Sequence, residues 1–360
     1  MNTENFLPNI YLNKHMKQAL LLQLVSKEPI NILFVGDPYS GKTTILQEMA
    51  KQKEKATFCN GILFTKILTP TNVLIKETMN NTELLCVDDV DSCTAEDRMV
   101  LKDILNSKMS VLAVANPKFG RFDPYDLIAN QINLPPTLIN RFDLIFPIKD
   151  MPGREKDEKM ASFILSLHKD PESAVFDIPT DLLRKFFAYV RQKANPQMSD
   201  EAIEELKEYY VKMRNSGASD EAGIKSIPIT ARQLEALVRL SEASAKIRLS
   251  KTVDKEDARK SIELIDYCLN QIAKDSETGK IDIDRLSSRI TASQRGGIST
   301  VKEIISALEE QTQSKIIPVE QIVEAAQEKQ ISPEKTEEAL EKLRRSGDIF
   351  EPKRGFIQKL

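Results

Sequence analysis

The sequence predicts an α/β domain built on a parallel sheet, followed by an all-helical domain and a C-terminal winged-helix domain. Two observations support this prediction. Short apolar runs alternate with segments of helical periodicity in the first 150 residues, which is typical of a parallel sheet covered by helices. Beyond about residue 153 the apolar runs give way to amphipathic helical stretches, and a short module of helices and strands follows them.

The first domain, residues 1–150, begins with a helix expected at residues 13–26. This helix leads into the apolar run INILFVG, which is typical of a strand buried on both faces. The same kind of strand is expected within three further segments, residues 82–89, 110–116 and 141–148. Because helical stretches lie between these runs, the sequence predicts a doubly wound sheet.

The second domain, residues 151–274, is expected to be a lid of amphipathic helices, at residues 155–168, 180–193, 199–214, 230–249 and 253–273. Residues 275–298 are polar and rich in Ser and Gly, which is typical of a linker. In residues 299–360 two short strands follow three expected helices, at residues 299–310, 318–329 and 332–346. Three helices and a β-hairpin predict a winged helix.

Composition and charge bound the class of protein. The 51 Lys+Arg and 54 Asp+Glu residues give a net charge of −3, so any contact with nucleic acid must be local. The four cysteines form no CxxC pair and support neither a zinc site nor a disulfide framework. The first ten residues do not have the basic and apolar regions of a secretory leader, and no run approaches the roughly 18 apolar residues of a membrane span, so neither is expected. A soluble cytoplasmic protein without a membrane partner is expected.

Residues 36–43 match the spacing G-x-x-x-x-G-K-[ST] of a phosphate-binding loop. The match follows a buried strand and opens a helix, so backbone N–H groups and the helix dipole would point at one anion. Lys42 would hold the β- and γ-phosphates of ATP, and Thr43 would ligate Mg²⁺. The alternative is a Gly-rich turn with a solvated lysine. The residues expected to bind ATP are Gly36, Asp37, Pro38, Tyr39, Ser40, Gly41, Lys42, Thr43 and Thr44.

Two acidic residues follow the apolar run of residues 82–89. Asp88 lies at the carboxyl end of the expected strand, where its carboxylate can reach the metal ion. The next residue, Asp89, can interact with the attacking water. Two adjacent acids could instead cap the next helix. A strand of this apolarity that ends in acids is the expected second half of a P-loop site, so we expect Mg²⁺ to be held by Thr43 and Asp88.

Residues 110–146 resemble the ATPase segment of the minichromosome maintenance (MCM) family of replicative helicases, which are AAA+ P-loop ATPases. Three further stretches resemble the family's first helix, the segment after its second acidic motif and its lid signature, at residues 9–24, 89–98 and 228–250. The similarity runs from about residue 8 to residue 274, and a C-terminal winged helix fits the archaeal members. The resemblance implies an ATP- and Mg²⁺-dependent enzyme that acts on DNA in replication.

The resemblance also implies roles for single residues. Asn116 matches sensor 1, an amide that orients the attacking water, although a strand-end turn is an alternative. Arg141 matches the arginine finger and Arg232 matches sensor 2, and the family presents both to the ATP of a neighbouring subunit. Arg121 matches a further sensor arginine, and an ordinary surface arginine is equally well supported. These matches imply a homo- or hetero-oligomer, which in this family is a ring.

The sequence departs from the family pattern in four places. Asp89 replaces the glutamate that is the family's water-polarising base, and the missing methylene predicts slow hydrolysis with ATP binding intact. The helix expected at residues 95–106 runs directly into the next strand, which leaves no room for the presensor hairpin. Residues 61–83 leave little room for the other channel hairpin. We expect no counterpart of the family's N-terminal DNA-binding domain. We therefore expect weakened DNA unwinding.

The candidate recognition helix of the winged-helix domain is acidic. Its four glutamates, which phosphate would repel, are Glu334, Glu337, Glu338 and Glu341. Basic residues of the helix end and the wing are Arg344, Arg345, Lys353 and Arg354. A protein-docking role is therefore supported as well as a DNA contact.

Three functions remain open at this point. The first is a reduced MCM-type motor that hydrolyses ATP and acts on DNA. The second is a nucleotide-switched regulatory or assembly subunit with weak hydrolysis and no helicase activity, whose partners are full-length MCM or other replication proteins. The third is a remodeller of proteins, which a protein client would stimulate. DNA-stimulated turnover favours the motor, whereas ATP binding with little turnover favours the switch.

Overall fold

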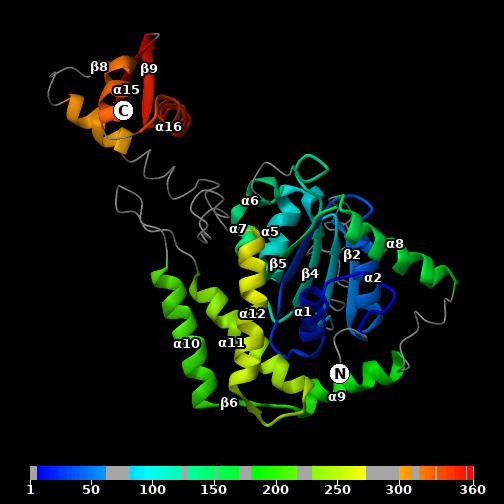
Figure 1. The fold of residues 1–360 in the computed structure, drawn as a ribbon. Helices are drawn as coiled ribbons and strands as arrows, with labels where there is room; N and C mark the ends of the chain where they lie inside the picture. The colour runs from blue at the N-terminus through cyan, green and yellow to red at the C-terminus, as the bar shows by residue number, and fades with distance from the viewer. Residues whose placement is uncertain are drawn as a thin grey trace. The chain divides into compact units, whose positions relative to one another are not determined.

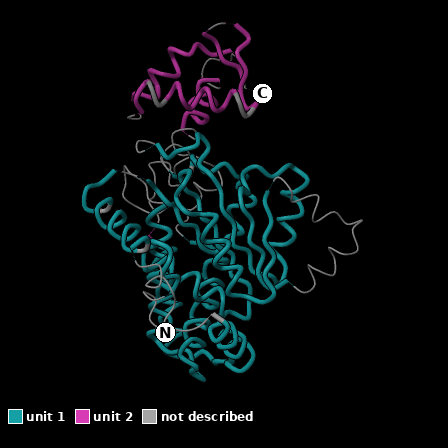
Figure 2. The backbone as a smooth tube through the Cα atoms, turned by 90° about the vertical axis from the view of Figure 1, so that its right-hand side faces the viewer, with its two compact units in different colours: residues 1–215, 229–274 teal, residues 216–228, 275–360 magenta. Residues whose placement is uncertain are grey.

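The computed structural model describes residues 6–61, 82–123, 128–150, 152–169, 180–216, 229–272, 300–309, 316–328, 331–353 and 355–359. The chain divides into two compact units (Figure 2). One comprises residues 1–215 and 229–274, and the other comprises residues 216–228 and 275–360. The first unit holds the predicted nucleotide domain together with the predicted lid, so the boundary between these two at residue 150 stays a prediction.

The first unit is built on five parallel strands in the order β2-β3-β4-β1-β5. These strands are β1 (Ile32–Gly36), β2 (Ala56–Asn60), β3 (Leu84–Asp88), β4 (Ser110–Ala115) and β5 (Leu144–Ile148). Every residue of β1, β3 and β4 is buried, as their unbroken apolar runs require. The predicted α/β fold with a parallel sheet is confirmed.

Strand β2 was not predicted from the sequence. It lies at the edge of the sheet, where Cys59 alone among its five residues is buried and Phe58 is 41% exposed. An edge strand needs no continuous apolar run, so its sequence lacks the signal that identifies the other four strands.

The core helices are α1 (Lys14–Val25), α2 (Lys42–Lys51), α5 (Ala95–Ile104), α6 (Ile128–Gln131) and α7 (Pro136–Ile139), with a 3-10 turn η3 (Val90–Ser92). Helix α1 begins after Asn13, whose Oδ1 accepts a hydrogen bond from the backbone N–H of Met16 at 2.8 Å. Helix α5 begins with a capping box between Thr94 and Asp97. Helix α2 starts at the end of β1 and packs on β3 and β4, so the turn before it lies at the carboxyl edge of the sheet.

In the described residues, the helices within the predicted lid are α8 (Arg154–Lys169), α9 (Thr180–Lys193), α10 (Asp200–Asn215), α11 (Ala231–Ile247) and α12 (Lys255–Ile272). Helices α11 and α12 pack together, and α12 lies along β5 (Figure 1). The prediction of an all-helical lid was wrong in one detail, since β6 (Gln197–Met198) and β7 (Thr252–Val253) form a small parallel sheet. Strands of two residues are too short to leave a periodic pattern.

The second unit has its own apolar core. Helical residues 300–309, α15 (Val319–Glu328) and α16 (Pro333–Ser346) pack on an antiparallel sheet of β8 (Ile316–Pro318), β10 (Phe356–Lys359) and β9 (Ile349–Lys353). Ile305, Ile322 and Leu343 are among the buried residues of this core. Gly355, with φ of +81°, allows the turn between β9 and β10. The assignment of this unit as a winged helix stays a prediction.

Two predicted features fall wholly or largely outside the described residues. One is the linker at residues 275–298. The other is the segment of residues 61–83, predicted to leave little room for a channel hairpin, of which residues 62–81 are not described. The other short connection is described, and only residues 105–109 lie between α5 and β4. Within the described ranges, no helix is long and apolar enough to cross a membrane.

Candidate nucleotide site and arginine edge

The predicted phosphate loop is a tight turn between β1 and α2. Gly41, immediately before α2, adopts φ of +80°, which favours glycine. At Gly36 a Cβ atom would lie 3.0 Å from both the Cβ of Ile148 and the Oγ of Ser40. Lys42 Nζ donates hydrogen bonds to the backbone carbonyl oxygens of Gly36 at 2.8 Å and Asp37 at 2.6 Å. The loop thus curls around the Lys42 ammonium group.

Asp37 ties this loop to its neighbours instead of pointing outward. The residue is 3% exposed, and its carboxylate accepts hydrogen bonds from the backbone N–H groups of Phe122 at 2.7 Å and Asp150 at 2.8 Å. Tyr39 has the opposite character, because it is fully exposed and its φ is +63°. Asp37 therefore sets the shape of the loop, whereas Tyr39 is open to contacts from outside the chain.

Burial lowers the pKa of the Lys42 ammonium group, and the nearby carboxylates of Asp88, Asp37, Asp89 and Asp91 oppose this shift in that order. Asp88, at the end of β3, is 6% exposed. The cation and the acidic residues at the end of β3 are thus close enough to act on each other. The structure brings together the two halves of the predicted site, the loop after β1 and the acids after β3.

Asp89 is held by two amides. Its Oδ1 accepts a hydrogen bond from Asn116 Nδ2 at 3.1 Å, and its Oδ2 accepts one from Asn60 Nδ2 at 3.2 Å. The backbone of Asp89 is left-handed, with φ of 49°. The predicted pair Asp89 and Asn116 therefore lies together. Sequence reasoning missed Asn60, which ends the unpredicted strand β2.

The residues present fit a nucleotide with Mg²⁺. Ser40 Oγ is buried without a hydrogen-bond partner within the described ranges, so an acceptor is missing inside the loop. Thr43 and Thr44 lie exposed in the first turn of α2. Among the described residues, no cluster of three or more His, Cys, Asp or Glu could hold a metal ion. Mg²⁺ commonly takes one or two protein ligands and completes its shell with phosphate and water.

A second cluster lies at the amino ends of the parallel strands, at the end of the sheet opposite to the phosphate loop. Arg141 follows α7 and precedes β5, and its Nε donates a hydrogen bond to the carbonyl oxygen of Thr137 at 3.1 Å. Its Nη1 contacts the amide oxygen of Asn106 after α5. The Arg141 carbonyl oxygen accepts a hydrogen bond from Arg232 Nη2 at 2.8 Å. The two arginines predicted to act on a neighbour are thus in contact.

Asp143 and Arg239 complete this cluster, which we call the arginine edge (Arg141, Arg232, Arg239 and Asp143). Arg239 Nη2 donates to Asp143 Oδ1 at 2.7 Å, and Arg232 Nε lies 3.8 Å from the same oxygen. Burial raises the pKa of the Asp143 carboxyl, and the guanidinium of Arg239 opposes the rise most strongly. Sequence reasoning missed both residues, although Arg239 follows Arg232 by two helical turns on α11.

The two clusters lie at opposite ends of the strands. The phosphate loop follows the last residue of β1, whereas Asp143 accepts a hydrogen bond from the backbone N–H of Asn31, directly before β1. A strand of five residues spans about 16 Å. Arg121 is exposed and directly precedes Phe122, which is bonded to the loop residue Asp37. The structure therefore separates Arg121 from the arginine edge.

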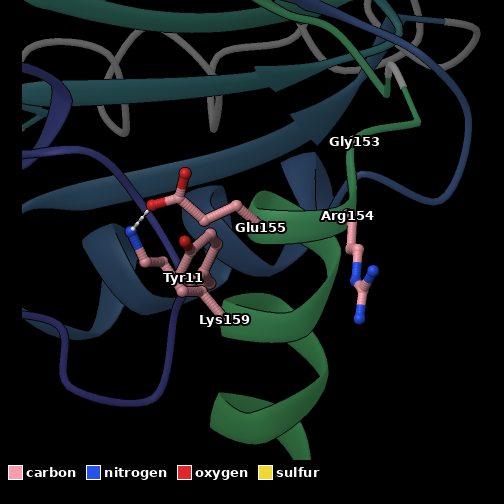
Figure 3. Close-up of a pocket in the computed structure, with 5 residues that line it drawn as sticks. All are labelled: Tyr11, Gly153, Arg154, Glu155 and Lys159. Atoms are coloured by element: carbon pink, nitrogen blue, oxygen red, sulfur yellow. Dashed lines mark hydrogen bonds and ion pairs between the residues drawn. The ribbon is translucent and has the colours of Figure 1, made fainter.

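A pocket of about 480 Å³ lies where α8 begins (Figure 3). Its lining residues are Tyr11, Gly153, Arg154, Glu155 and Lys159. Lys159 and Glu155 form an ion pair at 2.7 Å beside the Tyr11 ring, and the Arg154 side chain points away from them. The pocket begins three residues after Asp150, which is bonded to the phosphate loop. Sequence reasoning did not find this pocket.

Comparison with known proteins identifies the family. The family model of the MCM P-loop domain matches residues 2–168, and that of the MCM AAA-lid domain matches residues 181–269. The chain belongs to the MCM family. An uncharacterized MCM-type protein of Methanocaldococcus jannaschii is 35% identical over 95% of this chain. The minichromosome maintenance protein MCM of Saccharolobus solfataricus is 34% identical over 96% of it. The DNA replication licensing factor MCM4 of Oryza sativa subsp. japonica is 35% identical over 81% of it.

The comparisons also bound what can be transferred from these relatives. The chain spans 51% of the Methanocaldococcus protein, 55% of the Saccharolobus protein and 39% of the rice protein. Because the chain spans only part of these relatives, a role in DNA replication and an ATPase activity are proposals for this chain. The roles of single residues, the assembly and the action on DNA are proposals.

Proposed function

We propose that this MCM-family chain binds ATP with Mg²⁺ and hydrolyses it in sites shared between neighbouring chains, in the service of DNA replication. The observation that carries the proposal is the placement of the phosphate loop and the arginine edge at opposite ends of the strands. Because about 16 Å of sheet separates them, Arg141 and Arg232 cannot serve the phosphate loop of their own chain. A neighbouring chain that presents its arginine edge would complete the site.

Charge supports this assembly. Asp143 pairs with Arg239 and Arg232, Arg141 adds a third guanidinium near Arg232, and Glu235 is a second carboxylate close by. Three arginines against two carboxylates leave the arginine edge with a surplus of one positive charge. The surroundings of the phosphate loop carry surplus negative charge, because Lys42 lies near four carboxylates. A bound triphosphate would add to this negative charge. Opposite charges on two surfaces steer them together and favour the register in which arginine meets phosphate.

Within the phosphate site each residue has a proposed role. The backbone of residues 36–41 and Lys42 would hold the β- and γ-phosphates, with Thr43 and Asp88 as ligands of Mg²⁺. The metal ion would withdraw charge from the phosphate oxygens. Asp89 would take the proton of the attacking water, and Asn116, bonded to Asp89, would orient that water. Arg141 and Arg232 of the neighbouring chain would neutralise charge that develops on the γ-phosphate.

The Tyr11 pocket is proposed to hold the base of the nucleotide. Its position along the chain supports this, since the backbone at Asp150, three residues before Gly153, is bonded to the phosphate loop. Tyr11 is 42% exposed although its ring lies 5.5 Å from that of Phe163, and a purine ring stacks well on an accessible aromatic ring.

For the C-terminal unit we propose a winged helix that docks another protein. Two cations on α16 are already paired, Lys342 with Glu338 at 2.8 Å and Arg344 with Glu351 at 2.7 Å. Lys353 lies over the ring of Phe356. Paired cations among glutamates attract phosphate weakly, so DNA contacts of the assembly would come from elsewhere.

The second candidate function is a nucleotide-switched subunit with weak hydrolysis. The observation in its favour is that each carboxylate oxygen of Asp89 already accepts one amide hydrogen bond, from Asn60 or Asn116. The side chain is also one methylene shorter than the family's glutamate. A base held in this way binds water less readily, while the phosphate loop remains able to bind ATP.

The test is steady-state ATP hydrolysis by the purified protein, with and without single-stranded DNA, beside Lys42→Ala and Asp89→Glu. DNA-stimulated turnover that Lys42→Ala abolishes supports the motor. ATP binding without turnover, with turnover gained in Asp89→Glu, supports the switch. Turnover that persists in Lys42→Ala would refute both, because the phosphate site would then lie elsewhere.

A further inference from the structure

Asp143 is a carboxylate of the core that is bonded to one partner in the core and to one arginine of helix α11. Its side chain is 1% exposed, and Oδ1 accepts a hydrogen bond from Arg239 at 2.7 Å. Oδ2 accepts one from the backbone N–H of Asn31 at 2.8 Å. A charge buried this deeply is tolerated only when it is paired and hydrogen-bonded. The core therefore holds Arg239 of α11 in place.

Arg232 is held by the same carboxylate and by the backbone of Arg141. Its Nε is 3.8 Å from Asp143 Oδ1, and its Nη2 donates to the Arg141 carbonyl oxygen at 2.8 Å. Arg232 thus spans from the buried carboxylate to the backbone that carries Arg141. Both of its anchors belong to the core, although Arg232 itself is the second residue of lid helix α11.

The arginines at this edge keep unused donors. The Nε atoms of Arg232 and Arg239 are buried without a hydrogen-bond partner in the described part of the chain. Their side chains are 30% and 20% exposed, so part of each remains accessible at this edge although its Nε atom is buried. Two carboxylates, Asp143 and Glu235, act on these guanidinium groups. Against the three arginines they leave one positive charge unbalanced, and guanidinium groups bind phosphate in bidentate geometry.

We propose that Asp143 is a positioning residue, which fixes Arg232 and Arg239 at this edge so that they meet the phosphates of a neighbouring chain. The inference rests on the proposed function, in which Arg232 acts on the neighbour's ATP. Without the carboxylate, mutual repulsion of the guanidinium groups would turn Arg232 away from the Arg141 backbone. A displacement of about 1 Å in a positioned group costs on the order of 10²-fold in rate.

The test variant is Asp143→Asn, which has nearly the same shape and still offers an oxygen to the Asn31 N–H group but has no charge. We expect the kcat for ATP to fall about 10²-fold. The affinity of the variant's own phosphate loop for a fluorescent ATP analogue is expected to stay within twofold of the wild type. The matched control is Asp257→Asn, since Asp257 is also fully buried and paired with an arginine, Arg248, but at the far end of α11.

Mixing experiments separate a positioning role from a structural one. A mixture of Asp143→Asn with Lys42→Ala should regain turnover, because one chain supplies an intact phosphate loop and the other an intact arginine edge. A mixture of Asp143→Asn with Arg232→Ala should gain nothing, because both chains lack the same edge. If Asp143→Asn fails to fold, Arg239→Gln keeps the carboxylate and should show the same pattern of rescue with a smaller loss.

The outcomes distinguish the two claims. An inactive Arg232→Ala beside a fully active Asp143→Asn overturns the positioning role and leaves the proposed function standing. An Arg232→Ala variant as active as the wild type overturns the proposed function and the positioning role with it. Equal losses of kcat in Asp143→Asn and Asp257→Asn would show that Asp143 is only structural.

Discussion

Replacing Gly61 by alanine is expected to displace Asp89 and slow hydrolysis. The added Cβ would lie 2.3 Å from the backbone carbonyl oxygen of Asp89, whereas ordinary contacts begin near 3.4 Å, so about 1 Å of movement is required. That oxygen also accepts a hydrogen bond from Ser92 Oγ, and the Asp89 carboxylate is held by Asn116. Gly61 is not among the residues with positive φ, so the substitution causes no backbone strain of its own.

The expected loss for Gly61→Ala is about 10²-fold in kcat, the usual effect of a 1 Å displacement of a catalytic group. Affinity for a fluorescent ATP analogue should change little, because the phosphate loop is untouched. The control is Gly347→Ala, which introduces strain at φ of +80° in the second unit but meets no atom within 4 Å. A Gly61→Ala enzyme with wild-type kcat would refute the reasoning that the position of Asp89 limits turnover.

Three further predictions concern charge, base and pocket. Burial lowers the pKa of Lys53 from 10.5 to about 8, so the unfolded chain binds more protons between these pH values and stability rises with pH across that window. Lys53→Met should therefore raise the free energy of unfolding at pH 7 by up to about 3 kcal/mol. Chemical denaturation should show a smaller gain in this free energy at pH 10 than at pH 7. An equal gain at the two pH values would contradict the prediction. Asp89→Glu should raise kcat at least tenfold by restoring reach to water, as steady-state kinetics will show; no rise would mean that Asp89 is not the limiting base. Tyr11→Ala should weaken ATP binding about tenfold, because one stacking contact with the base is lost. Calorimetry should show that the binding of inorganic triphosphate is unchanged. If the binding of both ligands weakens equally, the base of ATP binds elsewhere.

The sequence predicts the elements whose signal is local. The strand before Gly36 is an unbroken apolar run, and the loop to Thr43 has a fixed spacing, so both could be found without a structure. Strand β2 could not, because an edge strand is only partly buried. Asn60 was missed for the same reason, since it belongs to that strand.

The arginine edge shows more clearly which residues cannot be predicted from the sequence. Arg141 and Arg232 could be singled out only through the resemblance to MCM proteins, because an arginine by itself carries no pattern. Asp143 and Arg239 are 96 positions apart along the chain and meet only because α11 packs against the core beside β5. Their pairing depends on tertiary contacts, which neither periodicity nor motif spacing reports.

The central claim is that phosphate loop and arginine edge act together across two chains. The most direct measurement is ATP hydrolysis by mixtures of Lys42→Ala and Arg141→Ala, each of which is expected to be inactive alone, at ratios from 1:9 to 9:1. The account predicts turnover that is highest near equal amounts, because mixed contacts pair an intact loop with an intact Arg141. No turnover at any ratio, in mixtures shown by native mass spectrometry to contain both chains in one complex, would contradict it.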